Sequence, residues 1–512
     1  MKYFESMKNI GVVAAPRGIS VAIARYLKEH CEKELHVYFR FKGDMDVKKK
    51  EHSKLFDSIK VYNFDNEDLV CELPNEGEVI NESIKWEKKI GSPITYTFHY
   101  ERFLGKGYYL GCREYPESIY SNSSYLSRTR ILHIANRRLN YWDNEIKKNN
   151  LDLIIGGPVE AHYAALANNI PYVMLQTSRY EDYWMWTNYL FNNSLVQKNF
   201  LAKKYLELDE INKFEIIERH AVGVGGPSHI NDLGWLKSTK KIYNALFWGL
   251  AYRVRALLIW KKLPKKHQKF FKAVKLPLME FVTYRRMTGK TVFKMKDLKG
   301  IKYISCPLHK EPETALQQAS PEFFDQYSMI INISMNLPSD MILVLMEHPK
   351  SMGRRGVEWY KKVNDLHNVF FIDIRVDSHE LIRESQAVAG ITGTSMLEGL
   401  RFGIPAIIFS QHSQFSNIYG AYVVSNSCEI IQAIDECLAY DSNKIRESAM
   451  LFLSSIVGSS FDLKGAGALW FELVGNYDYD KEIMKDAISK LEEYISFSDH
   501  YEPICKNQKT SF

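Results

Sequence analysis

Short apolar runs alternate with helically spaced segments in the first third of the chain. The apolar runs predict strands, and the spaced segments predict the helices that connect them. Predicted strands lie at residues 9–15, 35–41, 59–64, 151–155 and 172–175. Predicted helices lie at residues 20–31, 128–148 and 161–168. Strands that alternate with helices in this way are typical of βαβ units and of a parallel sheet.

The alternation stops near residue 180 and resumes at residue 302. The second set of predicted strands lies at residues 302–306, 341–346, 369–374, 387–391 and 406–409. The helices predicted there lie at residues 322–336, 378–385, 396–402, 429–440, 443–457 and 480–497. The pattern therefore predicts an α/β fold with two Rossmann-like domains. We expect an N-terminal domain at 1–180, a basic, largely helical insertion at 181–300, a second domain at 301–475, and a C-terminal helix and tail at 476–512.

Composition excludes several classes of protein. The 512 residues are 46% hydrophobic and 25% charged, which is typical of a soluble globular chain with two or three domains. Seven scattered cysteines without a CxxC motif argue against a zinc cluster or a disulfide framework, and they favour a reducing cytoplasm. The sequence has no run of 18 apolar residues, no P-loop and no metal-ligand spacing. We therefore expect no transmembrane helix, no metal and no cofactor.

Basic and aromatic residues concentrate at 237–299. This segment holds 18 Lys and Arg residues against two acidic ones, a balance of +16, whereas the whole chain has a net charge of +6. Its most apolar part is interrupted by Arg253 and Arg255, which suits a helix lying on a membrane better than one crossing it. A solvated basic hairpin and a nucleic-acid contact are the alternatives. We favour an anionic membrane surface over nucleic acid, because no nucleic-acid motif accompanies the charge.

Three turns of the second half follow predicted strands, and in a doubly wound sheet such turns meet at one edge. The first turn carries Glu313, and the second carries His348, Pro349 and Arg354. The third begins a helix with Thr392, Gly393, Thr394 and Ser395, and Glu398 follows one turn later. Unpaired N–H groups at a helix start attract phosphate, and cations add to that attraction. The set predicts a nucleotide site in which Glu398 binds ribose hydroxyls; the alternatives are ordinary N-caps and a packed core histidine.

The first half offers candidates for the other substrate. Glu160 and His162 follow the strand that ends in Gly156 and Gly157, and either one is a candidate acid or base. Arg179 follows the strand at 172–175 and is a candidate anion contact; a structural pairing with Glu181 is the alternative.

The turn motifs resemble the C-terminal half of capsule polysaccharide biosynthesis glycosyltransferases, which have two facing Rossmann-like domains (the GT-B architecture). The resembling residues are PLHKEPE at 307–313, EHP at 347–349 and GTSMLEGLRFGIP at 393–405. The match departs from the family at Lys310 and Glu311, where a glutamine-rich step is expected. His-Pro after a strand also looks like the donor-site motif of bacterial transferases that use CMP-activated acidic sugars. That resemblance implies that His348 contacts the donor phosphate or cytidine, and that Thr394 and Ser395 contact the phosphate.

Together these features lead us to expect a metal-independent glycosyltransferase that builds a bacterial capsule or another surface polysaccharide. CMP-Kdo or another CMP-acidic sugar is the first expected donor, and a UDP- or GDP-sugar is the next. The expected acceptor is a lipid-linked or polysaccharide chain, and residues 237–299 would hold a cytoplasmic protein on the inner face of the membrane. The alternatives are a nucleotide-sugar epimerase, a polyol-phosphate transferase of teichoic-acid type, and a non-catalytic assembly or export factor.

Overall fold

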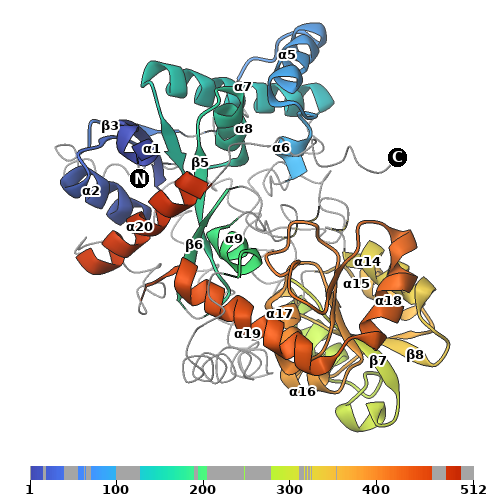
Figure 1. Ribbon diagram of the computed structural model, residues 1–512. Coiled ribbons are helices and arrows are strands. Elements are labelled where there is room, and N and C mark those ends of the chain that lie inside the picture. The colour runs from blue at the N-terminus through green and yellow to red at the C-terminus, as the bar shows by residue number, and fades with distance from the viewer. Residues whose placement is uncertain are drawn as a thin grey trace. The chain divides into compact units, whose positions relative to one another are not determined.

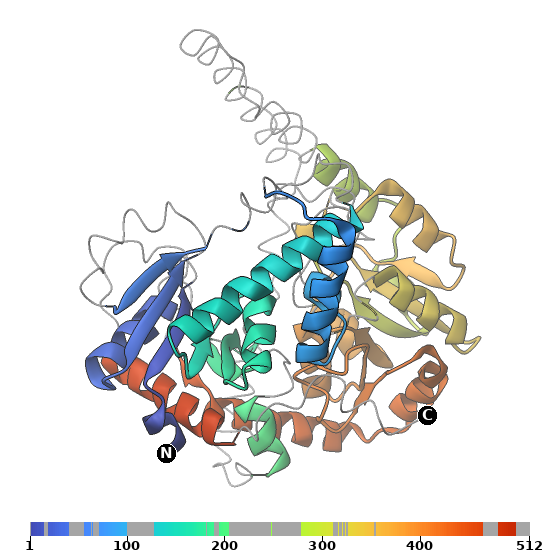
Figure 2. The same ribbon diagram turned by 90° about the horizontal axis from the view of Figure 1, so that it is seen from above.

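The computed structural model divides the chain into two compact units (Figures 1 and 2). Unit 1 comprises residues 1–104, 125–220 and 450–512, and unit 2 comprises 105–124 and 221–449. Within them the structure describes residues 2–14, 19–39, 56–62, 64, 71–99, 127–180, 182–188, 194–203, 247, 278–310, 316, 320, 323, 326–352, 355–463 and 480–497.

Unit 1 is built on a seven-stranded sheet with the order β13-β6-β5-β4-β1-β2-β3. Its strands are β1 (Asn9–Ala14), β2 (Glu34–Phe39), β3 (Ser58–Val61), β4 (Leu153–Ile155), β5 (Tyr172–Thr177), β6 (Tyr183–Thr187) and β13 (Phe461–Asp462). The strands from β1 to β5 are parallel, whereas β6 and β13 are antiparallel to their neighbours. Because β2 and β3 extend one way from β1 and β4 to β6 extend the other way, the direction of winding reverses between β1 and β4.

Helices cover both faces of this sheet. The helices described in unit 1 are α1 (Lys2–Ser6), α2 (Ile19–His30), α5 (Glu76–Ile90), α6 (Tyr96–His99), α7 (Arg128–Lys148), α8 (Val159–Ala167), α9 (Leu195–Leu201) and α20 (Lys481–Phe497). On one face, α1, α2 and α20 bury apolar side chains against Val12 and Ile155. On the other face, α7 and α8 pack against Val13 and Ile154. The α5 helix lies beside α7 (Figure 2). Successive residues of β1 and β4 therefore point to opposite faces of the sheet, as the two-residue period of a strand requires.

Unit 2 contains a six-stranded sheet with the order β12-β11-β10-β7-β8-β9. Its strands are β7 (Lys302–Pro307), β8 (Met341–Met346), β9 (Val369–Phe371), β10 (Ala387–Gly390), β11 (Ala406–Ile408) and β12 (Ala421–Val423), and every pairing is parallel. Read from β9, the sheet begins with its third, second and first strands in chain order and continues with the fourth, fifth and sixth. The winding reverses between β7 and β10, which is where open α/β sheets bind ligands.

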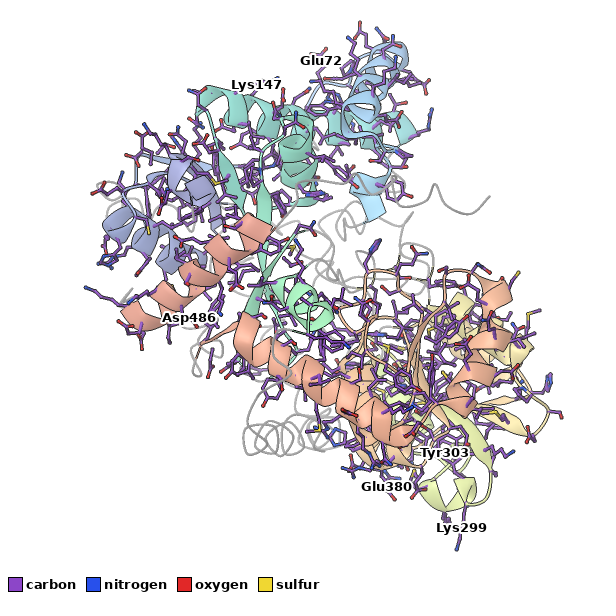
Figure 3. The ribbon with its side chains drawn as sticks, viewed as in Figure 1. Glu72, Lys147, Lys299, Tyr303, Glu380 and Asp486 are labelled. Carbon is purple, nitrogen blue, oxygen red and sulfur yellow. The ribbon has the colours of Figure 1, made fainter. Side chains whose placement is uncertain are left out.

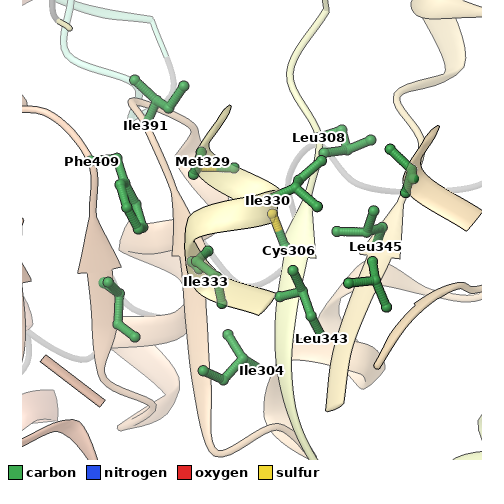
Figure 4. Packing of buried hydrophobic residues seen from close by; sticks show 14 of the residues in the cluster. Ile304, Cys306, Leu308, Met329, Ile330, Ile333, Leu343, Leu345, Ile391 and Phe409 are labelled. Atoms are coloured by element: carbon green, nitrogen blue, oxygen red, sulfur yellow. The ribbon is translucent and has the colours of Figure 1, made fainter. Parts of the chain in front are cut away.

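The core of unit 2 lies between this sheet and its helices. These are η4 (Met295–Leu298), α14 (Gln326–Asn336), η5 (Pro349–Ser351), α15 (Val357–Asn364), α16 (Ser378–Arg383), α17 (Thr394–Phe402), η6 (Ser427–Glu429), α18 (Ile430–Ala439) and α19 (Ser442–Ser459). Figure 4 shows α14 with Met329, Ile330 and Ile333 packed on the strands, beside Ile304 and Leu343. At the start of β7 the Tyr303 hydroxyl donates to the Leu381 carbonyl at 2.8 Å and so anchors α16. Figure 3 labels Tyr303, and Glu380 of α16, among the side chains of this unit.

The α/β fold class expected from the sequence is confirmed by the two parallel-rich sheets. The C-terminal boundary differs from the expected one, which extended the second domain to residue 475. The boundary between the units instead falls within α19, and β13 pairs with β6 of unit 1. Burial explains the placement of α20, because Ala487 and Leu491 lie in the core of unit 1. Most of the basic segment at 237–299 lies outside the described residues; within those described, no helix is long and apolar enough to cross a membrane.

Candidate functional site

Three turns lie at the carboxyl ends of β7, β8 and β10 in unit 2. Parallel pairing of β7 with both β8 and β10 brings these ends to the same edge of the sheet. The turns carry His309 after β7, Glu347 and His348 after β8, and residues 391–395 after β10. These turns lie where the winding of the sheet reverses, between β7 and β10. The sequence predicted that the turns after these strands meet at one edge, and the structure shows it.

His309 joins the first of these turns to the third. Its Nε2 accepts hydrogen bonds from the backbone N–H groups of Ile391 and Thr392, at 3.2 and 3.3 Å. A backbone N–H can only donate, so Nε2 must carry a lone pair, and a neutral ring must carry its proton on Nδ1. The side chain is 8% exposed. His309 is therefore a buried acceptor that connects the ends of β7 and β10.

The second turn contains a buried ion pair between Arg355 and Glu347, and Arg355 connects this turn to the first one. Arg355 Nε lies 3.0 Å from Glu347 Oε2, and both side chains are essentially inaccessible to water. Arg355 Nη2 also donates to the His309 carbonyl at 2.6 Å, and the Tyr360 hydroxyl donates to Glu347 Oε2 at 2.7 Å. Burial, followed by the nearby Glu347 charge, raises the pKa of Tyr360 well above its usual value. Both charges are thus paired and hydrogen-bonded, as buried charges must be.

His348 stands at the end of β8 with its backbone fixed from both sides. Its N–H donates to Glu347 Oε1 at 2.7 Å, and its carbonyl accepts from the Ser351 N–H at 2.8 Å. The side chain is partly exposed, and so is that of Pro349, which begins η5. The fixed backbone limits the directions that the imidazole can take.

The α17 helix begins without a side-chain cap. Gly393 is the N-cap residue, and it makes no side-chain cap hydrogen bond because it has no side chain. Thr394 and Ser395 are partly exposed, whereas Thr392 is 7% exposed and its amide already donates to His309. The N–H groups of the first helical turn have no intrahelical acceptor, so those of Thr394 and Ser395 are suited to an anion.

Glu398 lies on the same helix and pairs with α16. Its Oε2 is 3.5 Å from His379 Nε2, and the two side chains are 14% and 12% exposed. The interaction is an ion pair only when His379 is protonated. Two other predicted residues, Glu313 and Arg354, lie outside the described residues.

Glu160 and His162 lie in the layer of α7 and α8 in unit 1. Glu160 Oε1 is 3.1 Å from Arg138 Nη1, and both side chains are about 5% exposed or less. His162 is packed against the rings of Tyr163 and Tyr172, and burial lowers its pKa to about 3. At neutral pH the structure therefore holds a buried carboxylate in an ion pair and a neutral imidazole.

Arg179 occupies the hairpin between β5 and β6. Its φ of 67° lies in the left-handed region, which is uncommon for a residue with a side chain. Its backbone N–H donates to Thr177 Oγ1 at 3.2 Å. Among the described residues, its buried Nε has no hydrogen-bond partner. Glu181, the alternative partner expected from the sequence, lies outside the described residues.

Sequence reasoning assigned no role to four of the residues that connect the turns: His309, Gln326, Glu347 and Tyr360. It took Arg355 only as a possible phosphate contact beside His348. His309 and Glu347 lie inside the motifs PLHKEPE and EHP, directly after predicted strands. That position could have identified them as residues of the site. Their partners were not visible, because Arg355 and Tyr360 approach Glu347 only once β8 and α15 are packed. Within the described part of the chain, no group of three or more His, Cys, Asp or Glu side chains could hold a metal ion.

Comparisons with known proteins give remote structural likenesses. No protein-family model matches the chain, and the curated proteins contain no match. Among solved structures, the S. aureus MnaA–UDP co-structure is 11% identical, covering 96% of this chain and 97% of that one with a TM-score of 0.27. KpsC, a beta Kdo 2,7 transferase from Thermosulfurimonas dismutans, is 12% identical over 60% of this chain and 80% of its own, with a TM-score of 0.32.

A third similar structure is the UDP-GlcNAc 2-epimerase of Methanocaldococcus jannaschii in complex with UDP-GlcNAc and UDP. It is 10% identical over 86% of this chain and 97% of its own, with a TM-score of 0.25. Likenesses of this degree assign neither a reaction nor a substrate to this chain.

Proposed function

We propose that unit 2 binds a nucleotide sugar at the edge formed by its three turns, and that the protein transfers the sugar to a growing surface polysaccharide. The observation that carries this proposal is the meeting of the three turns where the winding of the sheet reverses, joined through His309. A carbonyl-rich or apolar edge would not suit a phosphate, whereas this edge presents the amides of Thr394 and Ser395 and the imidazole of His348.

The chemistry follows from the charge of the leaving group. When the sugar leaves, the nucleotide gains negative charge, and donors already aimed at its phosphate stabilise the transition state. In this proposal Thr394 and Ser395 hold the phosphate, and His348 donates to the phosphate or the base. The proposal also assigns nucleotide contacts to Pro349, Arg354, Gly393 and Thr392, and a ribose contact to Glu398.

Fewer observed contacts support the residues proposed to act on the acceptor substrate. Glu313, Glu160 and His162 remain the candidate acids or bases, and Arg179 remains the candidate contact for an anionic acceptor. Glu160 and His162 are buried, so either would act as a base only after its surroundings opened. The partly exposed Arg179, with its buried Nε lacking a partner among the described residues, is the better-placed of the unit 1 candidates to meet an anion.

Nucleotide affinity tests the donor site. Isothermal titration with CMP, UDP, GDP and CDP-glycerol should show one preferred nucleotide, and we expect CMP. His348→Ala should lower that affinity at least tenfold and abolish transfer, while the backbone bond to Glu347 and the fold persist. His367→Ala, which changes an exposed histidine of the same unit, is the control and should bind normally. No binding of any nucleotide, or normal binding by His348→Ala, would reject the proposal.

Product analysis separates transfer from epimerisation. With CMP-Kdo or UDP-GlcNAc and no acceptor, a transferase should leave the donor sugar unchanged apart from slow hydrolysis. Conversion of the sugar to its epimer under those conditions would replace transfer by epimerisation as the function.

We also propose that residues 237–299 hold the protein on an anionic membrane, near a lipid-linked acceptor. The proposal is supported by the balance of +16 and the interleaved aromatic residues of this segment. Flotation with phosphatidylglycerol vesicles should recover the natural chain and not a variant with these lysines changed to glutamine. Equal recovery of both would reject the membrane contact.

A further inference from the structure

We propose that His309 is the positioning residue of the donor site: it holds the turn that starts α17 so that the next two amides can meet the phosphate. This inference rests on the proposed function for its ligand, but its structural part can be tested without one.

The imidazole occupies the gap between the ends of β7 and β10. Its Nε2 accepts from two consecutive amides, those of Ile391 and Thr392, at 3.2 and 3.3 Å. Two successive N–H groups that point to one atom fix the path of the backbone between them. The amides of Thr394 and Ser395 follow directly, so their direction depends on that path.

The backbone of His309 is itself held by two buried side chains. Gln326 accepts from its N–H at 2.7 Å and donates to its carbonyl at 3.2 Å, and Arg355 donates to the same carbonyl at 2.6 Å. Gln326 is fully buried and Arg355 is 2% exposed. These contacts come from α14 and from the loop after β8, so the position of the ring is set from outside its own turn.

Gly393 leaves room for the imidazole. Its φ of −69° is open to any residue, so backbone freedom does not explain the glycine. A Cβ atom at this position would lie 3.0 Å from His309 Cε1 and 3.1 Å from Ser395 Oγ. Contacts that close require the ring or the hydroxyl to move. Gly393 and His309 therefore form a matched pair.

Three substitutions separate the role of the acceptor from the role of packing. His309→Leu keeps the approximate size of the side chain and removes the acceptor. His309→Asn carries an acceptor that is too short to reach the two amides, and His309→Gln carries one of nearly the right length. We expect nucleotide affinity, measured with whichever of CMP, UDP, GDP and CDP-glycerol binds best, to fall at least tenfold for Leu and Asn. The Gln variant should stay within about threefold of the natural protein.

Hydrogen exchange on the ligand-free protein gives a readout that is independent of nucleotide. Exchange at the Ile391 and Thr392 amides, which donate to His309, should be faster in His309→Leu than in the natural protein, and the Gln variant should restore protection. Should His309→Leu fail to fold, Gly393→Ala tests the same contact, because it displaces the ring while keeping the histidine; we expect a similar loss of affinity and protection.

The outcomes separate this inference from the proposed function. A natural protein that binds none of the four nucleotides rejects the donor site, and the exchange experiment still decides whether His309 fixes the turn. Protection of the Ile391 and Thr392 amides that is the same in the natural, Leu and Gln proteins would reject the positioning role, and so would an affinity loss in Gln equal to that in Leu.

Discussion

The two units share a winding order and differ in what they place at its reversal. Each contains a buried Arg–Glu ion pair near this point: Arg138 with Glu160 in unit 1, and Arg355 with Glu347 in unit 2. In unit 1 the pair connects α7 to α8, and the Arg138 guanidinium lies over the Phe64 ring. In unit 2 the pair also binds the His309 carbonyl, and Glu347 also accepts from the His348 amide. A buried Arg–Glu ion pair thus holds two helices together in unit 1, whereas in unit 2 it fixes the turns of the candidate ligand site.

The largest expected effect comes from breaking these pairs. Arg355→Met and Arg138→Met should each lower the free energy of unfolding by about 3–5 kcal/mol, because each leaves a buried carboxylate unpaired. Lys302→Met, which removes an exposed pair with Asp340, is the control and should change the free energy of unfolding far less than either buried pair. Urea unfolding measures all three, and a loss at either buried pair no larger than the control would contradict this account of the pairs.

Nucleotide affinity distinguishes the two pairs further. At a temperature where both variants are folded, Arg355→Met should bind nucleotide at least tenfold more weakly, because the His309 and His348 turns lose their common support. Arg138→Met should bind with normal affinity. The reverse result would move the donor site to unit 1.

A smaller effect is expected at the glycine turn of unit 1. Gly157 has a φ of +114°, and a Cβ atom there would lie 2.9 Å from Val13 Cγ2. Gly157→Ala should cost about 2–4 kcal/mol, since it adds backbone strain to steric overlap. Gly300, with a φ of +81° and no atom within 4 Å of the added Cβ, isolates the strain alone, and its Ala variant should cost about 1 kcal/mol. If urea unfolding shows the same loss of stability in Gly157→Ala and Gly300→Ala, the close packing of Gly157 against β1 contributes nothing.

The fold was largely predictable from local pattern; the helix α5 was missed despite its local cap at Asn75, and the missed strands have a different cause. The predicted helix at 128–148 and the predicted strand at 341–346 have the observed limits. The helix has apolar residues at helical spacing, and the strand is a continuous apolar run between Asp340 and Glu347. The strands β6, β12 and β13 were not predicted. Phe461 and Asp462 form β13 only because Trp184 and Tyr183 lie beside them, a pairing that no local pattern encodes.

The candidate site was predictable in outline only. Topology alone brings turns after parallel strands to one edge, so the sequence could place His348, Thr394 and Ser395 there. Their connection depends on distances between strands, which is why His309 went unrecognised. Arg354 and Arg355 are equivalent in the sequence, and only packing shows that Arg355 points inward to Glu347.

The smallest expected effect is a pH dependence in unit 1. Burial lowers the pKa of His162 to about 3, while an unfolded histidine titrates near 6.5. Below pH 6.5 the unfolded chain binds a proton that the folded chain does not, so stability contributed by the neutral ring is lost as the pH falls. Between pH 7.5 and 5.5 the loss should be about 1 kcal/mol. His162→Leu should reduce this dependence of urea unfolding on pH, and an unchanged slope would show that His162 does not titrate as its burial requires.

A structure with bound nucleotide tests the central claim most directly, namely that unit 2 holds the donor at its three turns. Crystals grown with the preferred nucleotide should show phosphate oxygens within hydrogen-bond distance of the Thr394 and Ser395 amides, with the His348 imidazole against the same molecule. Nucleotide bound instead beside the Gly157 turn of unit 1, or away from His348, would contradict the account.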